Sequence, residues 1–347
     1  MRKIAYLAMD VHARNIVMGD MNGAGNFLGN RNFGTCEDNI IDALKTVKAK
    51  KKLLVMEAGP LANWVARTAA PFVTEVFISD PRENALIYNS SVKKDKIDTQ
   101  KLCRLLRLNE FKAVYRPEND QRAIFKAAVQ HYNDLRDQLK AIKQKTKAMF
   151  RQWGVIDVFG DSVYSTSGRD KFLEQVQKRP ILLQLKRLYA LMDFTAQMKQ
   201  DAKKSMKSLG RHYPEIKEFK KIPGIGNAGA HTFDAYIQTP HRFAKTNRLW
   251  KYCRIGVTER SSDGKPLGFK RLDKAGIGEL KAVSYRAFIS AMKSDNEVKR
   301  FYLKSLQTTH NHTHARLNTQ RKILAVMLGI WKKGQPYRAE LFLDPCI

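Results

Sequence analysis

Short apolar runs alternate with turn residues over the first 115 positions, which is the pattern of a mixed α/β domain. Turns rich in glycine and asparagine, such as Asn22-Gly23, separate the first three runs. In the next segment Ile40, Leu44 and Val47 recur at helical spacing instead. The predicted elements are strands at 4–9, 15–20 and 27–30, a helix at 37–50, a strand at 53–57, a helix beginning at Gly59-Pro60 and a strand at 73–79.

Four acidic residues stand out against this pattern. The order of elements resembles an RNase H-like sheet, in which acidic side chains gather at strand ends and on a late helix. Asp10 ends the first apolar run, and Glu57 ends the strand at 53–57. Asp95 and Asp98 are three residues apart where a helical pattern begins, so they share one helix face. The other early acids are expected to be turn or cap residues: Asp20, Asp38, Asp42 and Asp80.

Converging carboxylates suit a magnesium site. Two Mg²⁺ ions about 4 Å apart need several hard oxygen ligands from different parts of a chain. The four acids therefore predict a two-metal site. Taken singly, Asp95 and Asp98 are equally well explained as the N-cap and a first-turn acid of a helix.

A different pattern covers residues 116–210, which are predicted to form a helical arm. Apolar positions between 120 and 153 alternate steps of three and four, the heptad seam of a coiled coil. A second helical block at 171–208 contains Pro180, which should break or restart it. We expect the arm to mediate dimerisation in preference to bundling within one chain. The seam residues are Phe125, Ala128, Tyr132, Leu135, Leu139, Ile142, Thr146 and Met149.

Residues 211–347 are predicted to form a mainly helical domain. The segment from Lys221 to Gly226 resembles a helix-hairpin-helix turn, in which Gly224 and Gly226 would let backbone N–H groups approach a phosphate. A plain glycine-rich helix connection would look similar. Further helices are expected at 278–292 and 313–333.

Charge indicates the partner. Lysine and arginine number 63 against 33 acidic residues, a formal charge of +30, so a polyanion is the expected partner. No apolar run approaches the roughly 20 residues that span a bilayer, and Met1-Arg2-Lys3 leads into a strand without signal-peptide features. The four cysteines lack CxxC spacing, which argues against zinc and disulfides and favours the cytoplasm.

Basic residues interleaved with aromatic ones suit phosphate contact and base stacking, although a solvated basic face has the same composition. Within the same region, the segment 259–266 contains Ser261 and Ser262 in a basic loop. A serine there could be a nucleophile toward phosphate, but an ordinary exposed loop explains it as well. The candidate contacts are Arg254, Lys265, Lys270, Arg271 and Lys274.

Several of these segments together resemble one family, the DEDD-type insertion-sequence transposases of the one-ten family, known as bridge-RNA-guided recombinases. The resemblance covers both ends of the chain in the family's order. Its motifs are Ala8-Met9-Asp10, Val55-Met56-Glu57-Ala58, Lys94-Asp95-Lys96-Ile97-Asp98-Thr99, Ile222-Pro223-Gly224-Ile225-Gly226, Arg242-Phe243, Ile255-Gly256-Val257, the serine loop and Lys274-Ala275-Gly276.

The resemblance implies a RuvC-type RNase H-like domain (1–115), a coiled-coil dimerisation arm (116–210) and a C-terminal transposase domain (211–347). It implies that a serine attacks DNA to form a covalent phosphoserine, with Mg²⁺ held by Asp10, Glu57, Asp95 and Asp98. Ser262 is the preferred nucleophile because the family's serine usually precedes a glycine. Asp263 replaces that glycine here, and Thr258 stands where proline is common, so Ser261 is the second choice.

The partners implied are a structured guide RNA (bridge RNA), donor and target DNA, and a homodimer that pairs into a tetramer, in the nucleoid-associated cytoplasm of a prokaryote. Two alternatives stay open. One is a RuvC-like, structure-selective, Mg²⁺-dependent endonuclease in which water attacks and the serine loop only binds. The other is a nucleic-acid-binding protein without catalysis. A charge of +30 suits all three.

Overall fold

The structure of the protein, a computed structural model, describes residues 2–81, 95–117, 120–258, 261–262, 265–266 and 271–343. For residues 95–97, 261–262 and 265–266 it describes the backbone alone. The chain divides into two compact units, Met1–Glu118 and Asn119–Ile347. The division lies close to the predicted boundary at 115, and the arm belongs to the same unit as the C-terminal region.

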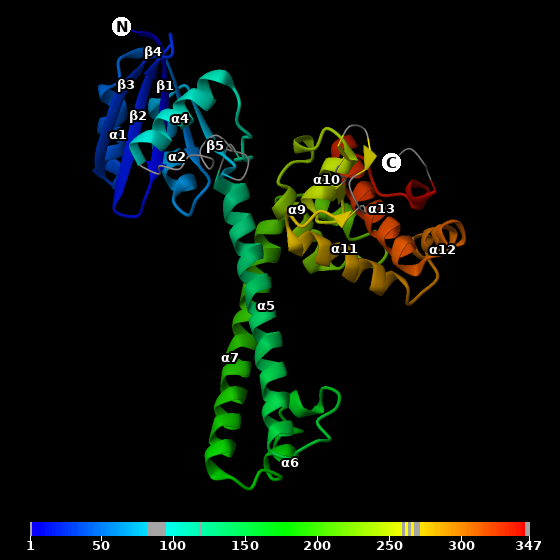
Figure 1. Ribbon diagram of the computed structural model, residues 1–347. Helices are drawn as coiled ribbons and strands as arrows, with labels where there is room; N and C mark the ends of the chain where they lie inside the picture. The colour runs from blue at the N-terminus through cyan, green and yellow to red at the C-terminus, as the bar shows by residue number, and fades with distance from the viewer. Residues whose placement is uncertain are drawn as a thin grey trace. The chain divides into compact units, whose positions relative to one another are not determined.

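A five-stranded mixed sheet in the order β3-β2-β1-β4-β5 forms the centre of the first unit (Figure 1). β1 pairs antiparallel with β2 and β2 with β3, whereas β4 pairs parallel with both β1 and β5. The predicted mixed α/β class and the predicted order of elements are confirmed. The elements are β1 (Arg2–Val11), β2 (Asn15–Asn22), β3 (Phe27–Gly34), α1 (Glu37–Thr46), β4 (Ala49–Glu57), α2 (Ala62–Ala69), β5 (Glu75–Ser79) and α4 (Asp95–Leu108).

Alternation of side chains along the strands builds an apolar core on each face of the sheet. Met9 and Met56 belong to the core that α1 and α2 cover. Ala8 and Val55, one position earlier on the same strands, belong to the opposite core, with Leu102 of α4. A residue of β1 or β4 that is an even number of positions from Ala8 or Val55 on its own strand therefore shares their face, and one an odd number of positions away lies on the other face.

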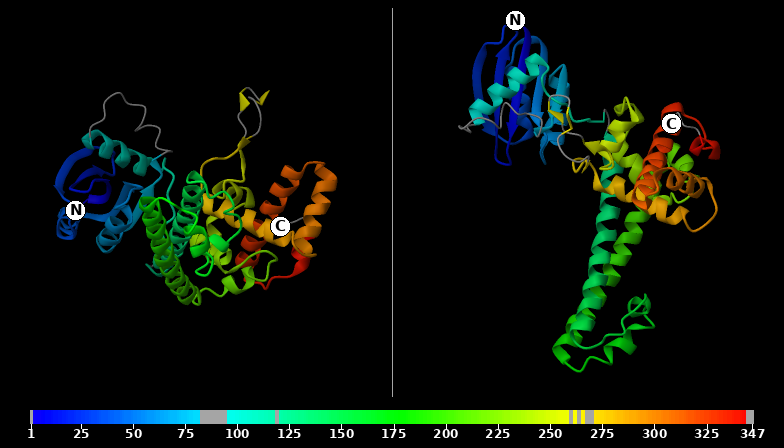
Figure 2. Two further views of the ribbon diagram at one scale, coloured as in Figure 1. Left: turned by 90° about the horizontal axis from the view of Figure 1, so that it is seen from below. Right: turned by 45° about the vertical axis from the view of Figure 1, so that its right-hand side comes forward.

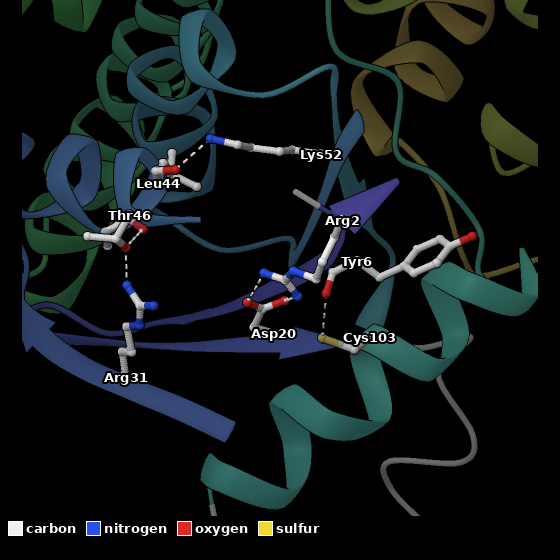
Figure 3. A network of polar contacts seen from close by, with 9 residues as sticks. Arg2, Tyr6, Asp20, Arg31, Leu44, Thr46, Lys52 and Cys103 are labelled. Carbon is white, nitrogen blue, oxygen red and sulfur yellow. Dashed lines mark hydrogen bonds and ion pairs between the residues drawn. The ribbon is translucent and has the colours of Figure 1, made fainter. Parts of the chain in front are cut away.

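Helix α4 crosses its face antiparallel to β1, as the order of its contacts shows. Figure 3 shows the middle contact, between Cys103 and Tyr6. The start of α4 is thus directed toward the carboxyl ends of β1 and β4. From the end of α4 to its start, the contacts are Arg107 Nε with Gly23 O at 3.3 Å, Cys103 Sγ with Tyr6 O at 3.4 Å, and Thr99 with Gly19, the register partner of Ala8.

The arm is a pair of long helices that lie side by side, α5 (Asp120–Gln152) and α7 (Arg179–Gly210), in both views of Figure 2. Pro180 lies in the first turn of α7, where its missing N–H costs no helical hydrogen bond, so it restarts the helix as predicted. Five of the eight seam residues are buried against other parts of the same chain: Phe125, Tyr132, Leu135, Leu139 and Thr146. These five residues therefore pack within the chain, and dimerisation through the arm stays a prediction.

The C-terminal region is mainly helical, as predicted, and its apolar core surrounds α13. Phe125 and Tyr132 of α5 join this core, which fixes the base of the arm to it. The elements are α6 (Arg169–Leu173) in the arm, then α8 (Glu215–Phe219), α9 (Asn227–Ile237), α10 (Thr246–Tyr252), β6 (Val257–Thr258), β7 (Ser261–Ser262), β8 (Lys265–Pro266), β9 (Arg271–Leu272), α11 (Gly278–Ala291), α12 (Glu297–Thr309) and α13 (His312–Lys333).

Candidate functional site

Two of the predicted carboxylates are neighbours on adjacent strands. Met9 of β1 is in register with Met56 of β4, so Asp10 and Glu57 form the next position along the same parallel pair. Adjacent strands are about 4.8 Å apart, and residues two apart share a face. Asp10 and Glu57 therefore lie on the face of Ala8 and Val55, which is the face that α4 covers.

The third carboxylate approaches the same face from α4. Asp98 precedes Leu102 by four residues and Leu105 by seven, and both leucines pack on the sheet, so Asp98 is on the sheet-facing side of the helix. Its Oδ1 atom is buried and has no hydrogen-bond partner among the residues that the structure describes. An unpaired buried carboxylate oxygen costs free energy, and a bound cation would remove that cost.

Asp95, the fourth predicted ligand, is the first residue of α4, and its side chain lies outside the described part of the chain. Among the side chains that are described, no three from histidine, cysteine, aspartate and glutamate form a group able to hold a metal ion. The described side chains of Asp10, Glu57 and Asp98 therefore do not come together as a three-residue metal group, although their oxygens suit the hard-oxygen preference of Mg²⁺.

His12 is a neighbour of this edge that the sequence patterns did not single out. Its Nε2 atom lies 3.2 Å from Asp10 Oδ2, and the residue follows the end of the β1 apolar run by two positions. A histidine that contacts a ligating carboxylate can fix the orientation of that carboxylate. Its spacing of two from Asp10 was the available signal.

Two other early acids lie on β2 and directly after β5. Both Asp20 oxygens accept hydrogen bonds of 2.7 Å from Arg2, a bidentate pair visible in Figure 3. Asp20 was expected in a turn or at a cap, but it is a residue of β2. Asp80 follows Ser79, the last residue of β5, and its backbone N–H donates a 2.9 Å hydrogen bond to Lys112 O.

The region of the predicted serine loop contains two short antiparallel strand pairs, which together are called the hairpin below. Thr258 of β6 pairs with Arg271 of β9, and nearer the tip Ser262 of β7 pairs with Lys265 of β8. Ser261 and Ser262 are thus adjacent residues on one arm of the hairpin. Their side chains and that of Lys265 lie outside the described part of the structure, as does all of Lys270.

The two glycines of the helix-hairpin-helix-like turn have different surroundings. Gly224 has a φ of +87°, and a Cβ there would come within 2.1 Å of Ala287 O in α11, so this glycine permits close helix packing. Gly226 is the N-cap of α9, is exposed, and has open space where a Cβ would stand. Only Gly226 therefore stands at an open helix start, where N–H groups favour an anion.

The predicted basic contacts surround the base of the hairpin. Arg254 has a φ of +56° and its Nε donates a 2.8 Å hydrogen bond to Gly276 O, so it closes the chain behind the hairpin. Arg271 and Lys274 are exposed. These positions leave Arg271 and Lys274 accessible to a polyanion and give Arg254 a structural role as well.

A buried ionic network joins the arm to the C-terminal region. Arg122, near the start of α5, donates a 2.8 Å hydrogen bond to Glu215 and a second hydrogen bond to Asp234, whose side chain is fully buried. Its guanidinium lies 3.7 Å from the ring centroid of Tyr213. Burial raises the pKa of Asp234, and the charge of Arg122 opposes that rise.

Part of the C-terminal region is similar in sequence to a transposase domain. Residues 216–303, from α8 into α12, match a sequence model of such a domain. The family is the one described as "Transposase IS116/IS110/IS902 family", which confirms the resemblance to the one-ten family. No curated protein matches the chain. None of the helices in the described residues is long and apolar enough to span a membrane.

Proposed function

We propose that the protein is an RNA-guided DNA recombinase that moves a mobile element by cutting and rejoining DNA through a phosphoserine. Its first unit would be a RuvC-type RNase H-like domain that binds Mg²⁺ through Asp10, Glu57, Asp95 and Asp98. The strand order and directions of the sheet support that assignment of the domain. The match to a transposase family supports the reaction class.

One observation carries the metal-dependent part of the proposal: a buried carboxylate oxygen without a described partner faces the sheet edge at which two other acids end neighbouring strands. Asp98 supplies the oxygen, and Asp10 and Glu57 are the strand-end acids. Bound Mg²⁺ would polarise the phosphate and stabilise the charge that develops on its oxygens. The role of the chain's own residues is to hold the ion and to orient the phosphate beside it.

The proposed strand cut conserves the number of phosphate ester bonds. The hydroxyl oxygen of Ser262, or of Ser261, forms a bond to phosphorus while the bond from phosphorus to one deoxyribose oxygen breaks. The serine loses its proton to solvent or a nearby base, and the released deoxyribose oxygen takes one up. In the rejoining step a deoxyribose hydroxyl attacks the phosphoserine and restores the serine.

Guidance by a structured RNA is proposed from the family resemblance. In it, the RNA pairs with donor and target DNA and so selects both sites, while basic side chains hold the nucleic-acid backbones. The charge of +30 is compatible with several polynucleotide strands bound at once. A homodimer that pairs into a tetramer remains a prediction.

Covalent trapping tests the serine chemistry. The full chain is incubated with Mg²⁺, the RNA transcribed from DNA flanking its reading frame, and labelled donor DNA, then denatured and analysed for a protein–DNA adduct. The adduct is expected with the unmodified protein and with Ser290→Ala, an exposed control on α11. It should disappear in Ser261→Ala/Ser262→Ala, in Asp10→Ala and after chelation of Mg²⁺.

Two outcomes oppose the proposal. Cleavage without any adduct would indicate the hydrolytic nuclease, in which water is the nucleophile. Binding without Mg²⁺-dependent cleavage under all these conditions would indicate the non-catalytic nucleic-acid-binding protein.

A further inference from the structure

A pocket of about 500 Å³ opens between α11 and α13, beside strand β9. Pockets of this size are typical of small-molecule and nucleotide sites. Apolar atoms form much of its wall, contributed by Leu272 of β9, Ala282 of α11 and Leu317 of α13. The pocket lies within the second compact unit, and all its lining residues are described.

An aromatic ring and two cations stand at this wall. Tyr285 is 43% exposed although it lines the pocket, so its ring is accessible to a ligand. The Arg316 guanidinium lies 5.6 Å from the centroid of that ring, and Lys281 is one helical turn before Tyr285 on the same side of α11. Bases stack on tyrosine rings and on guanidinium planes, and both cations attract the adjoining phosphates.

A fixed amide group adds hydrogen-bonding capacity. Gln320 lines the pocket and is buried, and its side-chain oxygen lies 3.2 Å from the Ser284 hydroxyl, which is also 2.9 Å from Lys281 O. The Gln320 amide group carries two N–H donors, which can donate to a ligand in the pocket. Every nucleobase carries acceptors on its edge, whereas an aliphatic ligand would leave these donors unsatisfied.

The position of the pocket relates it to the serine hairpin. Leu272 belongs to β9, which pairs with β6, and Ser261 and Ser262 form β7, which lies between β6 and β9 in the sequence. We infer that the pocket receives an unstacked nucleobase of a polynucleotide, held between Tyr285, Arg316 and Gln320. The inference deepens the proposed function and rests on it for the expectation that the base belongs to the strand handled by the hairpin.

Paired oligonucleotides test whether a base is recognised. The full chain is titrated with a fluorescent ten-nucleotide thymidine strand and with an abasic strand that has the same number of phosphates. Both titrations are then repeated with the corresponding strands built on ribose. One stacked base should make the base-bearing strand bind about 10-fold tighter than the abasic strand. Tyr285→Leu should remove that difference while the affinity for the abasic strand is unchanged. Whichever sugar gives the larger base-dependent difference identifies DNA or RNA as the source of the base.

Matched controls separate the pocket from general effects. Phe194→Leu, at a 63% exposed aromatic on the arm, and Lys304→Gln, at an exposed cation on α12, should retain the full difference. Arg316→Gln should reduce it and also weaken the abasic strand. Ala282→Phe, which places a bulky side chain in the pocket and keeps Tyr285, should abolish the difference and provides a second test if Tyr285→Leu fails to fold.

Three results would overturn the inference. They are equal affinities for base-bearing and abasic strands in the unmodified protein, a difference that survives in Tyr285→Leu and Ala282→Phe, and an equal loss of both affinities in those variants. Failure of the covalent trapping would remove the serine chemistry but not this difference. Failure here would leave the serine adduct intact, so the two proposals can fail separately.

Discussion

Replacing Arg122 by methionine should destabilise the second unit more than the loss of any other ion pair that the structure describes there. The substitution keeps most of the apolar stem but removes the charge from between Glu215 and Asp234. Asp234 then remains in a fully buried position with no cation, and its Oδ2 already lacks a hydrogen-bond partner among the described residues. The stacking of Arg122 on Tyr213, at 3.7 Å, is lost as well.

The magnitude follows from the burial of the partner that is left behind. Removing one member of a buried ion pair typically costs about 3–5 kcal/mol, because the remaining charge cannot be rehydrated. In a unit of this size about 1 kcal/mol changes the melting temperature by about 2–4 °C, so Arg122→Met should lower it by roughly 6–20 °C. Burial already raises the pKa of Asp234, and loss of Arg122 should raise it further.

Arg169 provides a matched control in the same unit. It also makes a bidentate pair with an aspartate, Asp193, at 2.6 Å, and lies 4.6 Å from a tyrosine ring. Asp193, however, is 58% exposed and can be rehydrated, so the pair should contribute at most about 1 kcal/mol. Arg169→Met should therefore cost much less than Arg122→Met.

The assay is urea unfolding of the full chain followed by circular dichroism, with melting curves as a second measurement. Combining Arg122→Met with Asp234→Leu should recover part of the loss, because the double variant leaves no buried charge at Asp234. Equal effects of Arg122→Met and Arg169→Met, or no recovery in the double variant, would refute the reasoning from burial.

Three further changes have defined outcomes. His231 is buried and donates a 2.7 Å hydrogen bond to Asn227 O, and burial lowers its pKa. As the pH decreases, this histidine is therefore protonated in the unfolded chain before it is protonated in the folded protein, so the free energy of unfolding should fall below a pH of about 6.5. His231→Gln should show a weaker pH dependence in equilibrium unfolding. Gly224→Ala should cost roughly 2–4 kcal/mol in urea unfolding, from its positive φ and the clash with Ala287, whereas Gly226→Ala should cost less than about 1 kcal/mol, and equal costs would contradict the packing role of Gly224. Mg²⁺ at ten times its dissociation constant should stabilise the unmodified protein by about 1.4 kcal/mol in thermal unfolding, an increment that should be lost in Asp98→Asn and retained in the exposed control Asp42→Asn.

Local patterns were sufficient to predict most of the elements. The helix expected at 278–292 is α11, Gly278–Ala291, and the one expected at 313–333 is α13, His312–Lys333. Their ends follow from signals within a few residues: Asn311 caps α13 through its side chain, and Gly334 ends it with a positive φ of 58°. Such signals belong to the sequence itself and do not depend on distant parts of the chain.

Partners distant in sequence could not be predicted in the same way. A heptad seam shows that α5 needs an apolar partner, but the partner proved to be α7 of the same chain, which the pattern does not specify. Nothing near Arg122 indicates acids 93 and 112 residues away. The left-handed conformation of Gly224 was foreseeable from a turn glycine, whereas its contact with Ala287 depends on how α9 and α11 pack.

The distribution of ion pairs is itself an argument for the metal site. Cationic side chains outnumber acids by almost two to one, and arginine neutralises acids in quite different settings: Arg2 with Asp20, Arg122 with Asp234, and Arg169 with Asp193. Asp98 Oδ1 and Asp234 Oδ2 are both buried without a hydrogen-bond partner among the described residues, but the other Asp234 oxygen is paired with Arg122. Leaving a buried carboxylate oxygen without a partner lowers the stability of the fold. That cost is recovered if the oxygen binds a cation that the polypeptide does not itself supply.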